Sequence, residues 1–165
     1  MLKYALLGIV QGLTEFFPVS SSGHLAILHK VLGLSGGELA LSVVLHLGTA
    51  FSLIVFFFKD IAILLRDKKM LLFIVIATII TGVIGIAGKD FFESVFASPR
   101  LIACSLIITG ITLIFTRKFM QAKRGSLNIK DVLLLGFTQG FAIIPGISRS
   151  GITISTLLFR GVDQK

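Results

Sequence analysis

The sequence predicts an all-α integral membrane protein, organised as an inverted-topology repeat with two broken, re-entrant helix hairpins and three full spanning helices. Of the 165 residues, 55% are hydrophobic and 15% are charged, and the mean hydropathy is +0.99. Soluble domains usually carry about a quarter charged residues, so the composition argues against a water-soluble enzyme and also against disorder. Long uncharged segments alternate with clusters of charge, and two apolar segments are interrupted by prolines and polar residues.

Three segments predict full spanning helices. Residues 39–58 and 70–88 carry no charge apart from an ionisable histidine, His46, and each meets the requirement of ~20 apolar residues. The uncharged stretch from Leu101 to Thr116 is shorter, so the third span is extended to residues 98–116.

Two flanking apolar segments, residues 4–29 and 132–159, predict re-entrant hairpins. The first is interrupted by a carboxylate, a proline and three serines, and the second by Pro-Gly and Ser-Arg-Ser-Gly. Such backbone leaves polar groups unpaired in lipid, so it survives at membrane depth only where protein or a water-filled cavity covers it. The alternative is two spanning helices with kinks.

Positive charge is concentrated in two loops, residues 59–69 and 117–131, within a chain of formal net charge +8. In a chain this apolar, the charge marks membrane orientation rather than a nucleic-acid partner. Two spans separate the loops, so they share one side, which the positive-inside rule makes the cytoplasm. The two hairpins then enter the membrane from opposite faces.

The two hairpins also resemble each other in sequence. A shift of 128 residues gives eight identities, without a gap, between residues 6–23 and 134–151. Three spans lie between the copies, so their orientations are opposite. We therefore expect one membrane domain over residues 1–165, with a first repeat at 1–116 and the start of a second at 131–165.

The first hairpin carries a carboxylate, Glu15, inside an apolar stretch, where an ionisable group is costly and therefore suggests function. Gln11 lies one helical turn before it, on the same face. Ser20–Ser22 lie close to His24, and a histidine is the commonest base for a serine nucleophile. The alternatives are an interfacial Glu15 and a structural His24; the chain's other histidines are assigned structural roles.

The second hairpin carries Arg149 between small and hydroxyl-bearing residues. Glycines let backbone N–H groups face an anion, and a guanidinium suits phosphate oxygens. A purely structural ion pair of Arg149 with Glu15 is the alternative. No Walker-type ending follows, which disfavours nucleotide binding. The two hairpins together indicate phosphoryl chemistry on an amphiphile.

The segments Gln11–His24 and Pro145–Thr153 resemble the signature motifs of the undecaprenyl-diphosphate phosphatases, also called bacitracin-resistance proteins. The resemblance covers the whole chain. It implies a multi-pass enzyme of the bacterial plasma membrane, with its site facing the outer side. Such an enzyme removes the terminal phosphate of undecaprenyl diphosphate and recycles the lipid carrier for peptidoglycan synthesis. It also implies a divalent cation, Mg²⁺ or Ca²⁺.

The resemblance also implies roles for individual residues. Glu15 would be a metal ligand or acid–base group, and Gln11 would be a further candidate ligand. Ser21 or a neighbouring serine would be the nucleophile, or a metal-bound water would attack instead. His24 would transfer protons and Arg149 would clamp phosphate. Hydroxyl residues of both motifs would assist at the phosphates: Ser20, Ser22, Ser148, Ser150 and Thr153.

Members of that family continue with further spanning helices beyond the second motif, so we expect a C-terminally truncated relative. Its partners would be the polyprenyl diphosphate lipid and either a second copy or a chain that supplies the missing helices, and no nucleic acid. Two alternatives stay open: a polyprenyl-phosphate transporter or flippase, and an inactive truncated fragment.

Overall fold

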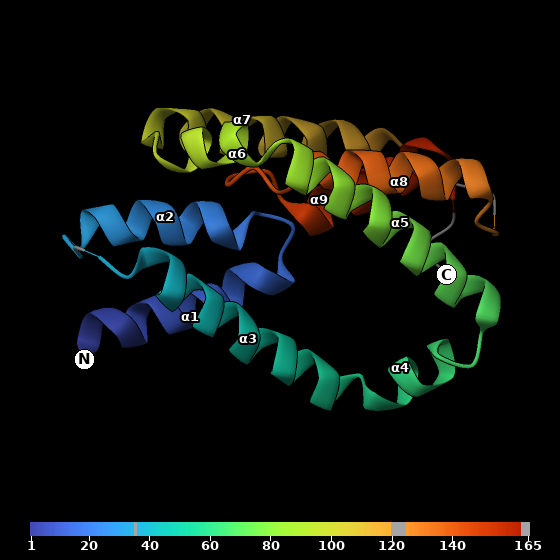
Figure 1. The fold of residues 1–165 in the computed structure, drawn as a ribbon, viewed down its shortest axis with the longest axis horizontal. Helices are drawn as coiled ribbons and strands as arrows, with labels where there is room; N and C mark the ends of the chain where they lie inside the picture. Colours follow the sequence, from blue (N-terminus) through green and yellow to red (C-terminus); the bar gives the residue numbers. More distant parts are fainter. Residues whose placement is uncertain (35, 120–124, 163–165) are drawn as a thin grey trace.

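The computed structural model describes residues 1–34, 36–119 and 125–162, and its elements are helices (Figure 1). This confirms the all-α prediction. The helices are α1 (Leu2–Phe16), α2 (Ser21–Val31), α3 (Glu38–Phe56), α4 (Phe58–Leu64), α5 (Lys68–Ala87), α6 (Lys89–Phe96), α7 (Pro99–Thr116), α8 (Ile129–Phe141) and α9 (Arg149–Phe159), with a 3₁₀ turn at Arg117–Phe119.

Among the described residues, two helices are long and apolar enough to cross a membrane: α5, and α7 with the turn that follows it. Capping residues set where they begin, because the side chains of Asp67 and Ser98 accept backbone N–H groups of the first turn. Together α3 and α4 form a third candidate span, but their axes differ by 79°. The segment expected at 39–58 therefore ends in a sharp bend at Phe57, and no proline or glycine marks the bend.

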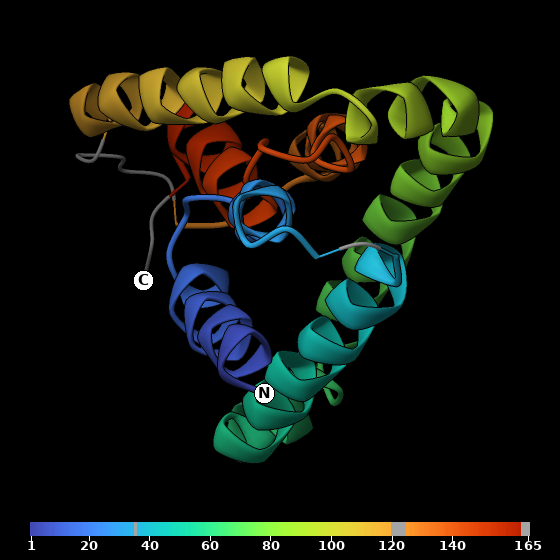
Figure 2. The same cartoon turned by 90° about the vertical axis from the view of Figure 1, so that its left-hand side faces the viewer.

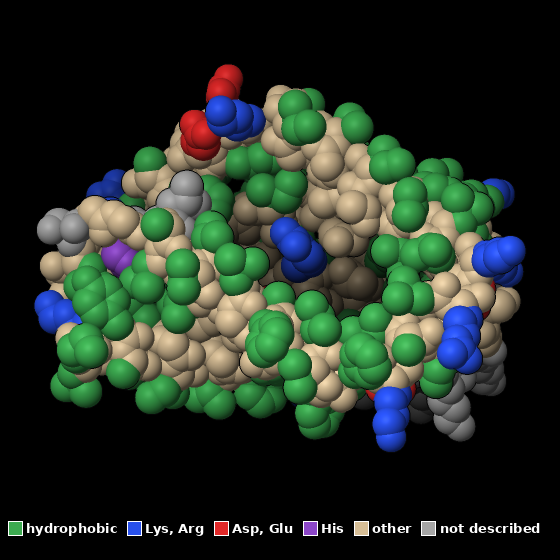
Figure 3. All heavy atoms as spheres, turned by 60° about the horizontal axis from the view of Figure 1, so that its bottom comes forward, with side chains coloured by type: hydrophobic (Ala, Val, Ile, Leu, Met, Phe, Trp, Pro, Cys, Tyr) green, Lys and Arg blue, Asp and Glu red, His purple; other side chains and the backbone are tan. Residues whose placement is uncertain are grey.

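Many large apolar side chains are exposed, and on the face shown in Figure 3 most basic side chains lie toward the ends of the molecule. Short α6, which was not expected, connects the two long helices and buries Phe92 and Val95. The second expected basic loop lies partly outside the described residues, which omit 120–124. Its described part lies at the same end of the molecule as α4 (Figure 1).

Helices α1 and α2 form one hairpin and α8 and α9 form another, and they enter the molecule from opposite ends (Figure 1). In the first, Lys3 Nζ donates to the carbonyl of Leu32 at 2.6 Å. In the second, Arg160 Nε donates to Asp131 Oδ1 at 2.8 Å. The same 128-residue shift that relates the sequences relates these two closing contacts, since it carries position 3 to 131 and position 32 to 160.

The hydrogen bonds at the tips of the two hairpins are also related by the 128-residue shift. Ser20 is the N-cap of α2 and accepts the N–H of Gly23, and Ser148 is the N-cap of α9 and accepts the N–H of Gly151. Each capping hydroxyl also lies 3.2–3.3 Å from the hydroxyl of the serine two positions later. The identical residues thus form the same local structure in both hairpins: a break in the chain followed by a helix that begins at a capping serine.

The tips pack against each other closely enough to require glycine. A Cβ added to Gly23 would lie 2.8 Å from the Cα of Gly146. A similar requirement holds between α5 and α8, where Gly136 and Gly140 lie against α5 and Thr81 donates to the carbonyl of Gly136. Small residues four apart let helix backbones approach without a side chain between them. The second hairpin is thereby fixed against the spanning helices (Figure 2).

Asp131 is expected to contribute strongly to stability. Its side chain is fully buried, bonds Arg160, and completes a capping box with Asn128 at the start of α8. Breaking a buried ion pair is costly, so Asp131→Ala should lower the unfolding free energy by about 2–3 kcal/mol, since Arg160 is partly solvated. Unfolding in mixed micelles measures the change. Asp67→Ala, which removes an exposed cap of α5, is the control and should cost about 1 kcal/mol. Equal losses in the two variants would contradict the role given to the ion pair.

Candidate functional site

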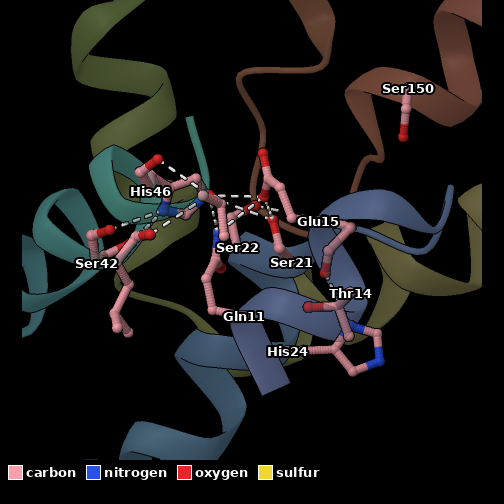
Figure 4. A network of polar contacts seen from close by, with 12 residues as sticks. Gln11, Thr14, Glu15, Ser21, Ser22, His24, Ser42, His46 and Ser150 are labelled. Atoms are coloured by element: carbon pink, nitrogen blue, oxygen red, sulfur yellow. Dashed lines mark hydrogen bonds and ion pairs between the residues drawn. The ribbon is translucent and has the colours of Figure 1, made fainter. Parts of the chain in front are cut away.

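A compact polar cluster forms where α1 ends and α2 begins (Figure 4). Glu15 lies in the last turn of α1, and Pro18 lies in the connection that reverses the chain before Ser21 opens α2. This reversal aims the hydroxyl of Ser21 at the carboxylate, and Ser21 Oγ donates to Glu15 Oε2 at 2.5 Å. Gln11, one turn earlier, donates from Nε2 to the same oxygen at 2.9 Å. The contact between Gln11 and Glu15 is the one that their helical spacing predicts.

A histidine from α3 completes the cluster. His46 Nε2 lies 3.4 Å from Ser21 Oγ and 3.5 Å from Glu15 Oε2. Its Nδ1 lies 2.8 Å from the carbonyl of Ser42, which can only accept, so Nδ1 carries a proton. Nε2 is then an acceptor in the neutral ring and a donor to Glu15 in the charged ring.

His24, the histidine that the sequence motif selects, is not brought to Ser21. Its Nδ1 lies 2.8 Å from the backbone carbonyl of Ser20, and its ring lies apart from the Glu15–Ser21 contact (Figure 4). His46, which sequence reasoning left as structural, is instead the histidine beside the serine. One signal could have found it, because it is an ionisable group inside an uncharged span.

Ser20, which was expected to bind the substrate phosphates, instead joins the tips of the two hairpins at the point where they cross. Its hydroxyl is buried and accepts the N–H of Gly146 at 3.1 Å as well as that of Gly23 at 3.4 Å. Its φ of +66° is in the left-handed region, which is uncommon for a residue other than glycine. Ser22 is half-buried, and its hydroxyl contacts Ser20.

The second motif is positioned by a threonine of α7. Thr109 Oγ1 donates to the carbonyl of Gly146 at 2.8 Å and accepts the N–H of Ser148 at 3.1 Å. This fixes the start of α9, whose first residue, Arg149, is exposed and forms no ion pair with another described residue. The ion pair with Glu15 considered from the sequence is therefore not formed.

The hydroxyl residues of the second motif divide into two groups. Ser148 is 2% exposed, and its hydroxyl caps α9. Ser150 and Thr153 are half-buried on the first turns of α9, and Ser150 lies apart from the Glu15 cluster (Figure 4). The helix start provides further N–H donors that favour an anion.

The oxygen donors of the cluster match only part of a divalent-cation site. The described residues contain no group of three His, Cys, Asp or Glu side chains that could hold a metal ion. However, Gln11 Oε1 is buried without a hydrogen-bond partner in the described structure, one turn from the Glu15 carboxylate. Mg²⁺ in particular is commonly held by one or two protein oxygens, with phosphate and water oxygens completing its shell. Glu15 and Gln11 fit that incomplete type of site.

Known proteins are similar to this chain over almost its full length. Residues 4–165 match the family described as bacitracin resistance protein BacA. An undecaprenyl-diphosphatase of Thermodesulfovibrio yellowstonii is 42% identical over 99% of this chain and 65% of its own length. Those of Halothermothrix orenii and Thermotoga petrophila are 39% and 44% identical, over 98% and 96% of this chain and 65% and 68% of theirs. The chain thus spans about two thirds of the length of these relatives. The resemblance carried by the two motifs is confirmed, and the chain belongs to the bacitracin resistance protein BacA family.

Proposed function

We propose that the chain acts as a membrane phosphatase that hydrolyses undecaprenyl diphosphate to undecaprenyl phosphate and inorganic phosphate. The observation that carries this proposal is the hydroxyl of Ser21, which is directed at a carboxylate inside an apolar molecule. A binding site for a phosphorylated lipid needs an anion clamp, but it does not need a serine paired with a base. The name shared by the relatives, undecaprenyl-diphosphatase, supports the same reaction.

In the proposed first step, Ser21 Oγ attacks the terminal phosphorus and passes its proton to Glu15. The new Oγ–P bond forms while the bond from phosphorus to the bridging oxygen breaks, and undecaprenyl phosphate leaves with the proton from Glu15. Glu15 then takes a proton from water, which attacks the phosphoserine; phosphate is released and the proton returns to Ser21. Each proton transfer uses the Ser21–Glu15 contact or a water at the same carboxylate.

Arg149 is proposed to neutralise the phosphates, because a planar guanidinium can bind two phosphate oxygens at once. It stands at the start of α9, where Ser150, Thr153 and free backbone N–H groups add hydrogen-bond donors. Positioning and charge neutralisation are the main contributions that proteins make to phosphoryl transfer. The absence of an ion pair on Arg149 within the described structure leaves this side chain available for the substrate.

Mg²⁺ or Ca²⁺ is the proposed cofactor, held by the Glu15 carboxylate and by Gln11 Oε1. When bound, such an ion would neutralise phosphate charge and orient the phosphate oxygens. The proposed location is the bacterial plasma membrane, with the site reached from the outer face. The basic residues of segment 59–69, which contains α4, support that orientation, since short basic loops are enriched on the cytoplasmic side of membranes.

Phosphate release from undecaprenyl diphosphate by the full chain, reconstituted in vesicles with Mg²⁺, tests the proposal. A membrane carrier is the competing function, because inverted hairpins that meet within the membrane are also built into transporters. We expect phosphate release from lipid on the accessible face. Movement of the lipid across the vesicle membrane with no phosphate released would overturn the enzymatic function.

His46 is expected to position Ser21 and Glu15 rather than to accept the proton. The serine donates to Glu15 at 2.5 Å, whereas both His46 contacts are longer, at 3.4 and 3.5 Å. His46→Gln retains a polar group at this place and should keep activity within about threefold, whereas His46→Leu should lose about tenfold to a hundredfold in kcat. Steady-state rates with undecaprenyl diphosphate measure both. Equal large losses in the two variants would assign proton transfer to the histidine.

A further inference from the structure

An apolar cavity of about 420 Å³ opens beside the candidate site, between α1, α2, α3 and α6. Its volume is typical of pockets that hold small molecules, which range over roughly 300–1,000 Å³. Most of its wall is aliphatic or aromatic. The apolar lining residues are Leu7, Leu25, Ala26, Leu41, Leu45 and Phe96.

Two residues that line the cavity are direct neighbours of the polar cluster. Ser22, which lines the cavity, directly follows Ser21 in α2. Ser42, which also lines it, provides the carbonyl that fixes His46. The part of the cavity wall next to the cluster is therefore polar, and apolar groups form most of the rest. His29 and Glu93 also reach the cavity, and Glu93 is exposed and pairs with Lys89.

We propose that this cavity binds the first prenyl units of the substrate, next to the diphosphate; this inference rests on the proposed function. Ser22 and Ser42 are the lining residues next to the cluster, so an amphiphile whose phosphate lies at Ser21 can place the adjoining part of its chain beside them. The apolar wall matches a branched hydrocarbon, whose burial contributes ~0.8 kcal/mol per methylene group. A long polyprenyl chain exceeds the cavity, so its distal part lies along the exposed apolar faces.

A cavity that binds only the first prenyl units makes substrate recognition insensitive to the total length of the chain. Recognition of the chain depends on the prenyl units near the diphosphate, so a farnesyl chain and an undecaprenyl chain should be recognised alike. A diphosphate without a prenyl group should bind much more weakly. Residues that narrow the cavity should therefore weaken binding of prenyl compounds while leaving the phosphate contacts intact.

Binding of farnesyl methylenediphosphonate, which cannot be hydrolysed between its phosphorus atoms, tests the inference without relying on turnover. The full chain in detergent is compared with Leu45→Phe, which narrows the cavity, and with Leu47→Phe, a control on the exposed face of the same helix. We expect Leu45→Phe to weaken binding at least about tenfold, since displacing two methylene groups removes that much affinity, and Leu47→Phe to bind like the unmodified chain. Binding of methylenediphosphonate itself should be the same in all three.

Equal affinity of Leu45→Phe and the unmodified chain for the farnesyl compound would overturn the inference while leaving the proposed hydrolysis untouched. Selective binding without any phosphate release from undecaprenyl diphosphate would instead overturn the proposed function alone. If Leu45→Phe does not fold, a farnesyl diphosphonate with a photoreactive group in its first prenyl unit serves on the unmodified chain. Labelling of α2 or α3 residues of the cavity supports the inference, and labelling elsewhere overturns it.

Discussion

Replacement of Ser21 by alanine is expected to lower phosphate release from undecaprenyl diphosphate by at least about a thousandfold, because it removes the attacking oxygen. Ser21 differs from its two serine neighbours in its hydrogen-bond partner. Its hydroxyl donates to Glu15, whereas the Ser20 hydroxyl accepts the N–H groups of Gly23 and Gly146. Within the described structure, the Ser22 hydroxyl is hydrogen-bonded to that of Ser20. Of three adjacent serines, one is paired with a carboxylate.

The measurement is the initial rate of phosphate release, together with acid-quenched reactions that use substrate labelled in its terminal phosphate. Label should be trapped on the peptide that contains Ser21. Ser52→Ala, an exposed position on α3, controls for expression and insertion and should keep normal activity. Glu15→Gln should slow release strongly, and combining it with Ser21→Ala should cause little further loss, because residues that act as one unit are not additive.

Two results would contradict this assignment. Substantial turnover by Ser21→Ala would mean that a water molecule, not Ser21, is the nucleophile. Loss of activity in Ser22→Ala with retention in Ser21→Ala would transfer it to the neighbouring serine. The trapped label separates these outcomes, because only an attacking serine becomes labelled.

The helix hairpins could be predicted from the sequence because local chemistry decides them. A proline and capping serines interrupt each apolar segment, so the chain must break there whatever surrounds it. The spans at 70–88 and 98–116 could also be predicted, and their bounds lie within two residues of those of α5 and α7. The sharp bend at Phe57 could not be predicted, because it occurs within a run of phenylalanines that carries no helix-breaking residue.

The site was only partly predictable, because some of its contacts are local in sequence and others join distant segments. Gln11 and Glu15 are one turn apart, so their contact follows from helical geometry. His46 meets Ser21 only because α3 packs beside the start of α2, across 25 positions of sequence. Ser20 meets Gly146 across 126 positions, and no local pattern distinguishes a serine that joins two hairpins from one that binds phosphate. Contacts of this kind depend on the assembled fold.

Gly146→Ala is expected to disrupt the crossing of the two hairpins and to have the largest effect on stability. Gly146 has a φ of +98°, and an added Cβ would lie 2.6 Å from the carbonyl oxygen of Ile102 and 2.7 Å from the Cβ of Ser105. One neighbour is backbone and the other is the base of a side chain, so neither can rotate away. Strain and overpacking together should lower the unfolding free energy by about 3 kcal/mol or more.

The same substitution should also reduce activity in whatever protein remains folded. The N–H of Gly146 binds Ser20 and its carbonyl binds Thr109, so a shift of this residue displaces the starts of α2 and α9 together. Gly161→Ala is the matched control, because Gly161 also has a positive φ, +73°, but has nothing within 4 Å of an added Cβ. It should cost only the backbone strain, about 1 kcal/mol, and leave phosphate release unchanged. Unfolding in mixed micelles and the rate of the folded fraction measure both variants. Equal losses of unfolding free energy in the two glycine variants would mean that the hairpin tips can move apart. The contacts at Gly146 would then not hold the Ser21 cluster and Arg149 in a fixed arrangement.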